Sequence, residues 1–183
     1  MKIFIQTYGC QINEYDSARI ADAMARPGYE GTDQTDEADL IVLNTCSVRD
    51  KAEQKVYSAL GRLRELKEKK AGLIIGVGGC VAQQEKARIL QRAPYVDLVF
   101  GTHAIHKLPQ MVSDLQRHAK KSVETEFYRD PSYMENLSGK TEVRGPKAYV
   151  AIMQGCNKVC SFCVVPHVRG RALSRPSAAV TSL

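Results

Sequence analysis

Residues 39–46 read DLIVLNTC, a run of apolar and β-branched side chains that ends in asparagine, threonine and a cysteine. Continuous apolarity over so short a run is typical of a strand buried on both faces of a parallel sheet. Two further runs of this kind also end in a cysteine, FIQTYGC at 4–10 and LIIGVGGC at 73–80. The chain therefore repeats one pattern, in which a thiol follows a buried strand.

Segments with helical periodicity separate these strands. The pattern predicts strands at 2–7, 39–44, 73–77 and 96–100, a short strand near Tyr29, and helices at 13–25, 50–70, 83–92 and 105–118. This alternation predicts an open parallel α/β sheet with helices on both faces, a doubly wound three-layer domain over residues 1–118. The glycines at 76, 78 and 79 lack the spacing of a dinucleotide-binding turn. The sequence therefore gives only weak support for nucleotide binding.

The chain changes character after residue 118. Residues 119–146 are polar and aperiodic, with proline and glycine as breakers, and are predicted to be a linker. A fresh strand is predicted at 147–153 (KAYVAIM), leading directly into Gly155 and Cys156. Residues 147–183 are therefore expected to begin a second domain.

Composition and charge narrow the class of protein. With 183 residues, 44% of them hydrophobic and 25% charged, the chain has the composition of a globular protein. The first apolar run is too short for a secretory leader, and no stretch approaches the roughly 20 apolar residues of a membrane span. We therefore expect a cytoplasmic protein without a membrane partner. Residues 140–175 hold seven Lys or Arg and one acid, which suits RNA or an anionic cofactor, although a solvated basic face is the alternative.

Cys10, Cys46 and Cys80, here called the first triad, each follow a predicted strand. Because the cytosol keeps thiols reduced, metal or redox chemistry is favoured over disulfides. The carboxyl ends of parallel strands meet at one edge of a sheet, so the three thiols are expected to converge there. Gly9 and Gly79 would let the backbone approach a bulky inorganic group. The alternative is three ordinary buried cysteines at the sheet edge.

Cys156, Cys160 and Cys163, here called the second triad, form C-x3-C-x2-C on a short loop after the predicted strand. Three such thiolates can ligate three irons of a 4Fe-4S cluster and leave the fourth iron open for a substrate or cofactor. The alternative is a tetrahedral zinc site in which His167 supplies the fourth ligand.

The second triad lies within MQGCNKVCSFCVVPHVRGRALSRP (153–176), which resembles the signature of radical S-adenosylmethionine enzymes and, within them, of the methylthiotransferase family. The segments TYGCQINEYDSAR (7–19), NTCSVRDKAEQKV (44–56) and the Gly-Gly-Cys at 78–80 are similar to the N-terminal domain of that family, which carries a second 4Fe-4S cluster. The wording of these motifs, and VDLVFGT at 96–102, is most similar to the branch that methylthiolates N6-isopentenyladenosine beside the tRNA anticodon.

The resemblance implies a transferase with two 4Fe-4S clusters and S-adenosylmethionine as cofactors. The open iron of the second cluster would chelate S-adenosylmethionine, which is cleaved to a 5'-deoxyadenosyl radical. The first cluster would hold the sulfur that is methylated and then joined to the substrate radical. Phe162 is similar to the family's apolar position near the cofactor's adenine, with a packing role as the alternative. The implied partners are tRNA and an electron donor such as flavodoxin or ferredoxin, and the implied full-length enzyme is a monomer.

Two departures from the family pattern affect these expectations. Ala172 stands where the branch usually has an acidic residue, and the chain stops at Leu183, whereas the family continues through most of a β/α barrel and an RNA-binding domain. We therefore expect the chain alone to be inactive or nearly so, and prone to aggregate. A ribosomal-protein aspartate or threonylcarbamoyladenosine remains open as the substrate. A non-catalytic iron-sulfur or zinc module and a flavodoxin-like domain remain open as other classes.

Overall fold

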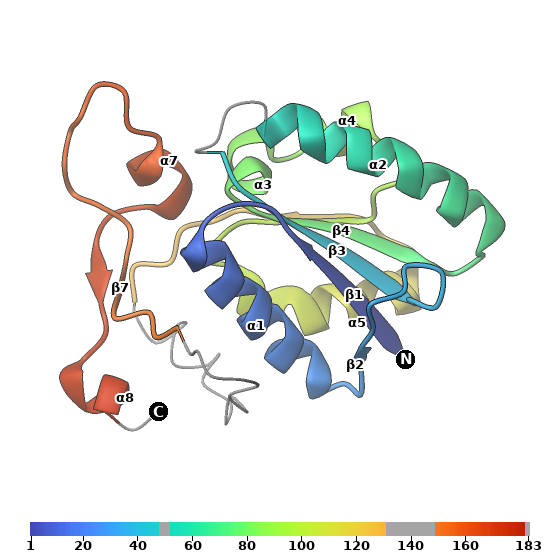
Figure 1. Cartoon of the computed structure of the whole chain (residues 1–183), viewed down its shortest axis with the longest axis horizontal. Helices are drawn as coiled ribbons and strands as arrows, with labels where there is room; N and C mark the ends of the chain where they lie inside the picture. Colours follow the sequence, from blue (N-terminus) through green and yellow to red (C-terminus); the bar gives the residue numbers. More distant parts are fainter. Residues whose placement is uncertain (48–51, 131–148, 182–183) are drawn as a thin grey trace.

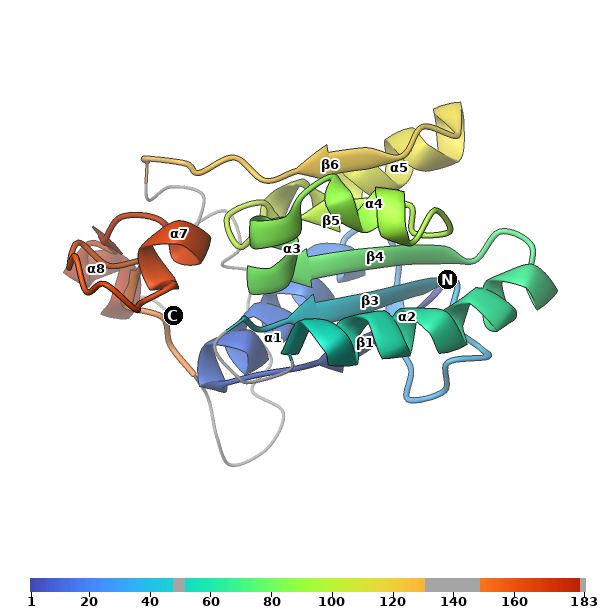
Figure 2. The ribbon, with the colours of Figure 1, turned by 90° about the horizontal axis from the view of Figure 1, so that it is seen from above.

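The computed structural model describes residues 1–47, 52–130 and 149–181, and its centre is a parallel sheet of six strands in the order β2-β1-β3-β4-β5-β6 (Figures 1 and 2). The strands are β1 (Lys2–Thr7), β2 (Glu30–Gly31), β3 (Leu40–Thr45), β4 (Ile74–Gly79), β5 (Leu98–Phe100) and β6 (Ser122–Glu124). Every neighbouring pair in this sheet is parallel. The predicted parallel α/β sheet is therefore confirmed.

Helices cover both faces of the sheet, as the alternating pattern predicts. One face carries α1 (Gln11–Ala25), the short 3-10 helix η1 (Ile105–Lys107) and α5 (Leu108–His118), and the other carries α2 (Ala52–Lys69), α3 (Cys80–Glu85) and α4 (Arg88–Arg92) (Figure 1). No helix of the described ranges is long and apolar enough to cross a membrane.

The apolar core consists of two layers, one on each face of the sheet. The position of β3 between the two layers explains why its sequence is continuously apolar. Leu40 and Val42 belong to the layer under α1 and α5, whereas Ile41 and Leu43 belong to the layer under α2. All six residues of β3 are buried. Successive side chains of a strand point to opposite faces, so a strand covered on both sides needs apolar residues at every position.

Two elements differ from the sequence prediction. The helix predicted at 83–92 is split into α3 and α4, because Lys86 has a φ of +52°, which a continuous right-handed helix does not allow. Within the predicted linker, residues 122–124 form β6, which pairs parallel with β5. This edge strand has one apolar residue, Val123, which is exposed, so it carries no burial pattern in the sequence. Residues 131–146 of the predicted linker lie outside the described residues.

The C-terminal segment folds against the carboxyl end of the sheet. It contains β7 (Met153–Gln154), α7 (Val165–Arg169), β8 (Leu173–Ser174) and α8 (Ser177–Thr181), and β7 pairs antiparallel with β8. Of the strand predicted at 147–153, only Met153 lies in a strand among the described residues, and residues 147–148 lie outside them. This small hairpin does not show the predicted start of a β/α barrel. Helix α7 lies beside α3 (Figures 1 and 2).

Candidate functional site

The first triad lies at the carboxyl edge of three adjacent strands. Cys10 is the N-cap residue of α1 after β1, Cys46 directly follows β3, and Cys80 begins α3 after β4. Since β1, β3 and β4 pair side by side and parallel, the topology brings the three cysteines to one edge. Cys46 and Cys80 are buried and Cys10 is half-buried.

Two glycines allow the three cysteine-bearing loops to approach one another. Gly9 has a φ of +135°, and a Cβ added there would lie 2.5 Å from the Cβ of Cys46. Gly79 has a φ of +89°, and its added Cβ would lie 2.4 Å from the backbone oxygen of Thr45. Both contacts are shorter than real atoms tolerate. The glycines therefore allow the packing of loop against loop.

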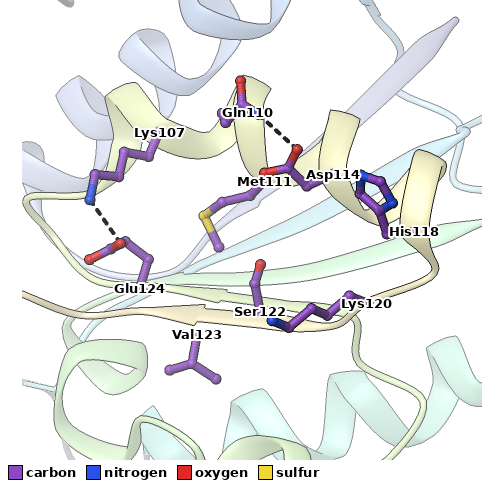
Figure 3. A pocket seen from close by; sticks show the side chains of 9 residues that line it. All are labelled: Lys107, Gln110, Met111, Asp114, His118, Lys120, Ser122, Val123 and Glu124. Carbon is purple, nitrogen blue, oxygen red and sulfur yellow. Dashed lines mark hydrogen bonds and ion pairs between the residues drawn. The ribbon is translucent and has the colours of Figure 1, made fainter.

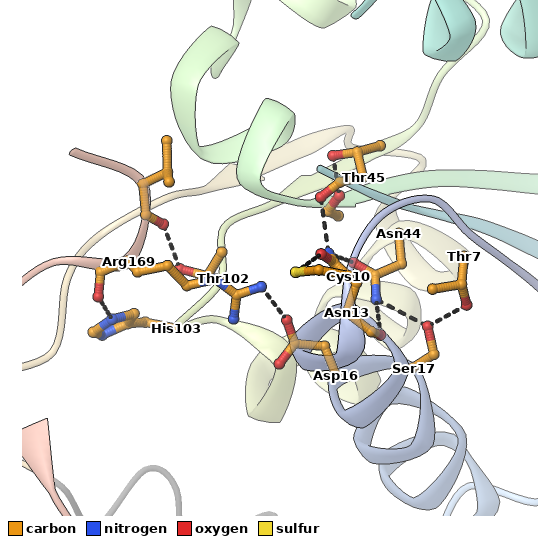
Figure 4. A network of polar contacts seen from close by, with 12 residues as sticks. Thr7, Cys10, Asn13, Asp16, Ser17, Asn44, Thr45, Thr102, His103 and Arg169 are labelled. Atoms are coloured by element: carbon orange, nitrogen blue, oxygen red, sulfur yellow. Dashed lines mark hydrogen bonds and ion pairs between the residues drawn. The ribbon is translucent and has the colours of Figure 1, made fainter. Parts of the chain in front are cut away.

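Buried amide and hydroxyl side chains hold these loops together (Figure 4). The Nδ2 of Asn13 donates to Asn44 Oδ1 at 3.2 Å and to the Thr45 backbone oxygen at 3.0 Å, and Asn44 Nδ2 donates in return to the Asn13 backbone oxygen at 2.8 Å. The Thr45 hydroxyl accepts from the Val81 amide at 3.1 Å and donates to the Gly78 oxygen at 2.6 Å. The Cys10 thiol donates to Asn13 Oδ1 at 3.4 Å. The edge is thus shaped by bonds within the chain.

Arg169 reaches from α7 into the same edge (Figure 4). Its Nη2 lies 2.7 Å from Oδ2 of Asp16 on α1, and the two side chains are only 4% and 5% exposed. Burial raises the pKa of the Asp16 carboxyl, and the guanidinium opposes part of that rise. Burial works against the charge of Arg169, but the Asp16 carboxylate and the Cys80 thiol raise its pKa. The 2.7 Å contact between them favours the charged form of both groups.

The loop after β5 holds the backbone of α7. The Thr102 hydroxyl donates to the Val168 oxygen at 2.7 Å, and His103 Nε2 lies 2.9 Å from the Arg169 oxygen (Figure 4). The Tyr128 amide donates to His103 Nδ1 at 3.2 Å. Because Nδ1 accepts this bond, the proton of the neutral ring is on Nε2, which donates to the Arg169 oxygen. Burial lowers the pKa of His103, in agreement with a neutral imidazole.

The second triad lies on the loop between β7 and α7. Cys160 is exposed, whereas Cys156 and Cys163 are half-buried. The Cys156 amide donates to the Gly170 oxygen at 3.1 Å, so the start of this loop is tied to the end of α7. Phe162 is 92% exposed, so the packing role considered for it is not seen among the residues that the structure describes. Ala172, at the position where an acid was expected, offers its amide to Asn157 Oδ1 at 3.0 Å.

The two proposed kinds of metal centre make different geometric demands. Within the described parts of the chain, no group of three or more His, Cys, Asp or Glu side chains is placed to hold a metal ion, so the four-ligand zinc arrangement with His167 is not seen. The cysteines of a 4Fe-4S cluster each bind a different iron and need not converge on one point. Three thiols from three tightly packed loops suit that donor set.

The guanidinium of Arg169 offers a further hydrogen-bond donor to a cluster at this edge. Nη1 of Arg169 is buried and has no hydrogen-bond acceptor among the described residues. Burial raises the pKa of the Cys80 thiol, and the Arg169 guanidinium counteracts part of that rise. Helix α7, which carries Arg169, packs against α3, which begins at Cys80. An unpaired buried N–H costs about 1–3 kcal/mol. A cluster sulfur at this edge would supply the acceptor.

Several residues of this edge, among them Thr102, His103 and Asp16, were not predicted from the sequence. Thr102 and His103 follow β5 as the cysteines follow their strands, so the carboxyl-edge rule applied to β5 could have found them. Asp16 gives no such signal, because it lies on a regular helix and its partner Arg169 is at the other end of the chain.

A pocket of about 530 Å³ lies elsewhere, between α5 and β6, and contains no cysteine (Figure 3). Within it, Lys107 Nζ donates to Glu124 Oε2 at 2.9 Å, and Gln110 Nε2 donates to Asp114 Oδ1 at 2.7 Å. The pocket therefore adds nothing to the cysteine site.

Comparison with known proteins gives one family match and a set of similar named sequences. The model of the uncharacterized protein family UPF0004 matches residues 2–101, which include the whole first triad. A tRNA-2-methylthio-N(6)-dimethylallyladenosine synthase of Burkholderia ambifaria strain MC40-6 is 53% identical over 176 residues, and one of Burkholderia lata is 52% identical over the same length. Each match covers 96% of this chain and 38% of the relative. The chain therefore spans well under half the length of these relatives.

Proposed function

The chain belongs to the protein family UPF0004 and matches the N-terminal portion of methylthiotransferases, and on this basis we propose that it serves the methylthiolation of N6-isopentenyladenosine next to the tRNA anticodon. The names of the similar Burkholderia proteins support this substrate. In this proposal S-adenosylmethionine is both radical source and methyl donor, and the protein acts on tRNA in the cytoplasm with an electron donor such as flavodoxin or ferredoxin.

One observation carries the proposal. Three thiols follow three adjacent parallel strands, and the second cysteine loop is docked onto the same edge through α7. We assign one 4Fe-4S cluster to each triad. When bound, the clusters and S-adenosylmethionine supply the radical and sulfur-transfer chemistry, whereas the protein supplies position and exclusion of water.

The residues of the chain have separate tasks in this proposal. The six thiolates would hold iron, and the network of Asn13, Asn44 and Thr45 keeps the loops of the first triad at fixed positions. The exposed ring of Phe162, between two cysteines of the second triad, is available to contact the adenine of S-adenosylmethionine. The exposed side chains of Lys158 and Arg171 contribute positive charge for an anionic partner.

Iron analysis tests the two-cluster assignment. After anaerobic reconstitution with iron and sulfide, we expect about eight irons and eight labile sulfides per chain. Changing the first triad to alanine should leave about four irons, and changing the second triad should also leave about four. A colourless protein with one tightly held zinc would overturn the assignment.

Nucleoside analysis tests the substrate. In cells that lack the full-length protein, tRNA should retain isopentenyladenosine and lose its 2-methylthio derivative. A full-length copy should restore it, whereas residues 1–183 alone should restore little or none. Re-expression with Cys10→Ala should not restore the modification, because one ligand of the proposed first cluster is missing. Normal methylthio-isopentenyladenosine in cells without the protein, together with loss of another methylthio group, would assign a different substrate.

A further inference from the structure

Arg169 combines three features that the docking of α7 does not explain. Its guanidinium is buried, it is charged through the 2.7 Å contact of Nη2 with Asp16 Oδ2, and its Nη1 lacks an acceptor among the residues that the structure describes. The backbone of α7 is already held by the Thr102 hydroxyl and the His103 ring. A neutral side chain of similar size would fill the same space at a lower desolvation cost.

The position of the charge suggests its use. Helix α7, which carries Arg169, packs against α3, which begins at the buried Cys80. Asp16 is the counter-ion of the guanidinium. In iron-sulfur proteins, hydrogen bonds to the sulfurs and nearby charges set the reduction potential. A buried cation is little screened by solvent, so its influence on a cluster at this edge would be strong.

We propose that Arg169 is a positioning residue for the cluster of the first triad, whose unpaired Nη1–H donates to a sulfur at Cys80 and whose charge raises the reduction potential of that cluster. This inference rests on the proposed function, since it presupposes a cluster on Cys10, Cys46 and Cys80. Asp16 fixes the guanidinium and partly offsets its charge. Because Arg169 belongs to the segment that carries the second triad, the correct potential requires that segment to be docked.

The two halves of the ion pair give opposite expectations. Arg169→Gln removes a positive charge and a donor near the cluster, so the reduction potential should fall. Asp16→Asn removes the offsetting negative charge, so the potential should rise. Loss of structure alone would move both variants in the same direction, since either change breaks the same contact. The sign of each shift therefore separates an electrostatic role from a structural one.

The experiment uses the full chain with the second triad changed to alanine, so that one cluster remains. Redox titration followed by visible and electron paramagnetic resonance spectra gives its potential for the parent, Arg169→Gln, Asp16→Asn and the double variant. Because the double variant replaces the charged pair with two neutral amides, it avoids a buried unpaired charge. We expect the potential to rise in the order Arg169→Gln, double variant, parent, Asp16→Asn.

Iron content separates failure of this inference from failure of the proposed function. A parent that binds no iron at the first triad would refute the proposed function. A parent with about four irons, and variants with the same iron content but unchanged or equally directed potentials, would overturn the role of Arg169 alone. If Arg169→Gln does not fold, the double variant and Asp16→Asn still give the order of potentials, and any other order contradicts the inference.

Discussion

At the scale of the single residue, Gly79 shows how closely the cysteine loops are packed. Its φ of +89° and ψ of −157° lie in a region that is almost restricted to glycine, and an added Cβ would meet the Thr45 oxygen at 2.4 Å. We expect Gly79→Ala to lower the free energy of unfolding by at least about 2 kcal/mol, from backbone strain and displacement of β3. It should also reduce the iron held by the first triad. Chemical denaturation and iron analysis measure the two effects.

A matched glycine elsewhere provides the control. Gly61 lies within α2, has an ordinary φ, and an added Cβ would meet no atom within 4 Å. Gly61→Ala should therefore raise the free energy of unfolding by about 0.5–1 kcal/mol, because alanine favours the helix. Iron binding should remain unchanged. If both substitutions had the same effect on the free energy of unfolding and on iron binding, Gly79 would not be needed for the close approach of the loops.

The residues of the site differ in how far the sequence alone predicts them. Cys10, Cys46 and Cys80 are predictable at the sheet edge, because each follows a recognisable strand and parallel strands share one direction. The ion pair of Asp16 with Arg169 is not predictable, since it depends on how two distant segments dock. Local patterns encode which face of an element is buried, and they do not encode which distant charge will meet it.

At the scale of the element, the docking of α7 depends on the protonation of His103. The neutral ring accepts from the Tyr128 amide at Nδ1 and donates to the Arg169 oxygen from Nε2. A second proton on Nδ1 would face the Tyr128 N–H and break the first of these bonds. Burial lowers the pKa of His103 below its ordinary value of about 6.5. The docked helix therefore disfavours the charged ring.

The sign of the pH dependence follows from this lowered pKa. Docking of α7 should have its full stability above the ordinary histidine pKa of about 6.5, and should weaken as the pH falls from there through the lowered pKa of His103. We expect the amide signals of Arg169 and Gly170 to follow the His103 titration in nuclear magnetic resonance spectra. His103→Gln should abolish that titration. The neighbouring His106, whose pKa is also lowered by burial, provides the control variant His106→Gln, which should leave the titration in place.

Elements differ in predictability for a related reason. Strand β3 and helix α2 have long apolar patterns, so their positions are predicted to within a few residues. Strand β6 has three residues at an exposed edge, and its pairing with β5 supplies what the sequence pattern lacks. The break between α3 and α4 depends on Lys86 in a positive-φ conformation, which the side chain itself does not favour. Tertiary context decides both cases.

At the scale of the whole molecule, the two triads differ in how much of the chain they connect. The first triad joins loops after β1, β3 and β4, which are separated by complete strand-helix units. The second triad lies within a single loop between β7 and α7. A metal clip that closes long loops removes more conformational freedom from the unfolded chain than one that closes a short loop. The same kind of cluster should therefore stabilise the fold differently at the two sites.

Reconstitution should accordingly raise the thermal unfolding midpoint mainly through the first triad. A cofactor that binds only the folded state shifts the folding equilibrium toward that state. Here the first cluster would connect the ends of three strands of the central sheet. We expect the midpoint gained on reconstitution to fall sharply when the first triad is changed to alanine, and to fall little when the second triad is changed. Calorimetry of both variants, before and after reconstitution and with iron content measured on the same samples, makes this comparison. If reconstitution raised the midpoint equally little in both variants, the C-terminal segment would unfold together with the sheet. Its docking through Arg169, Thr102 and His103 would then be as stable as the central core.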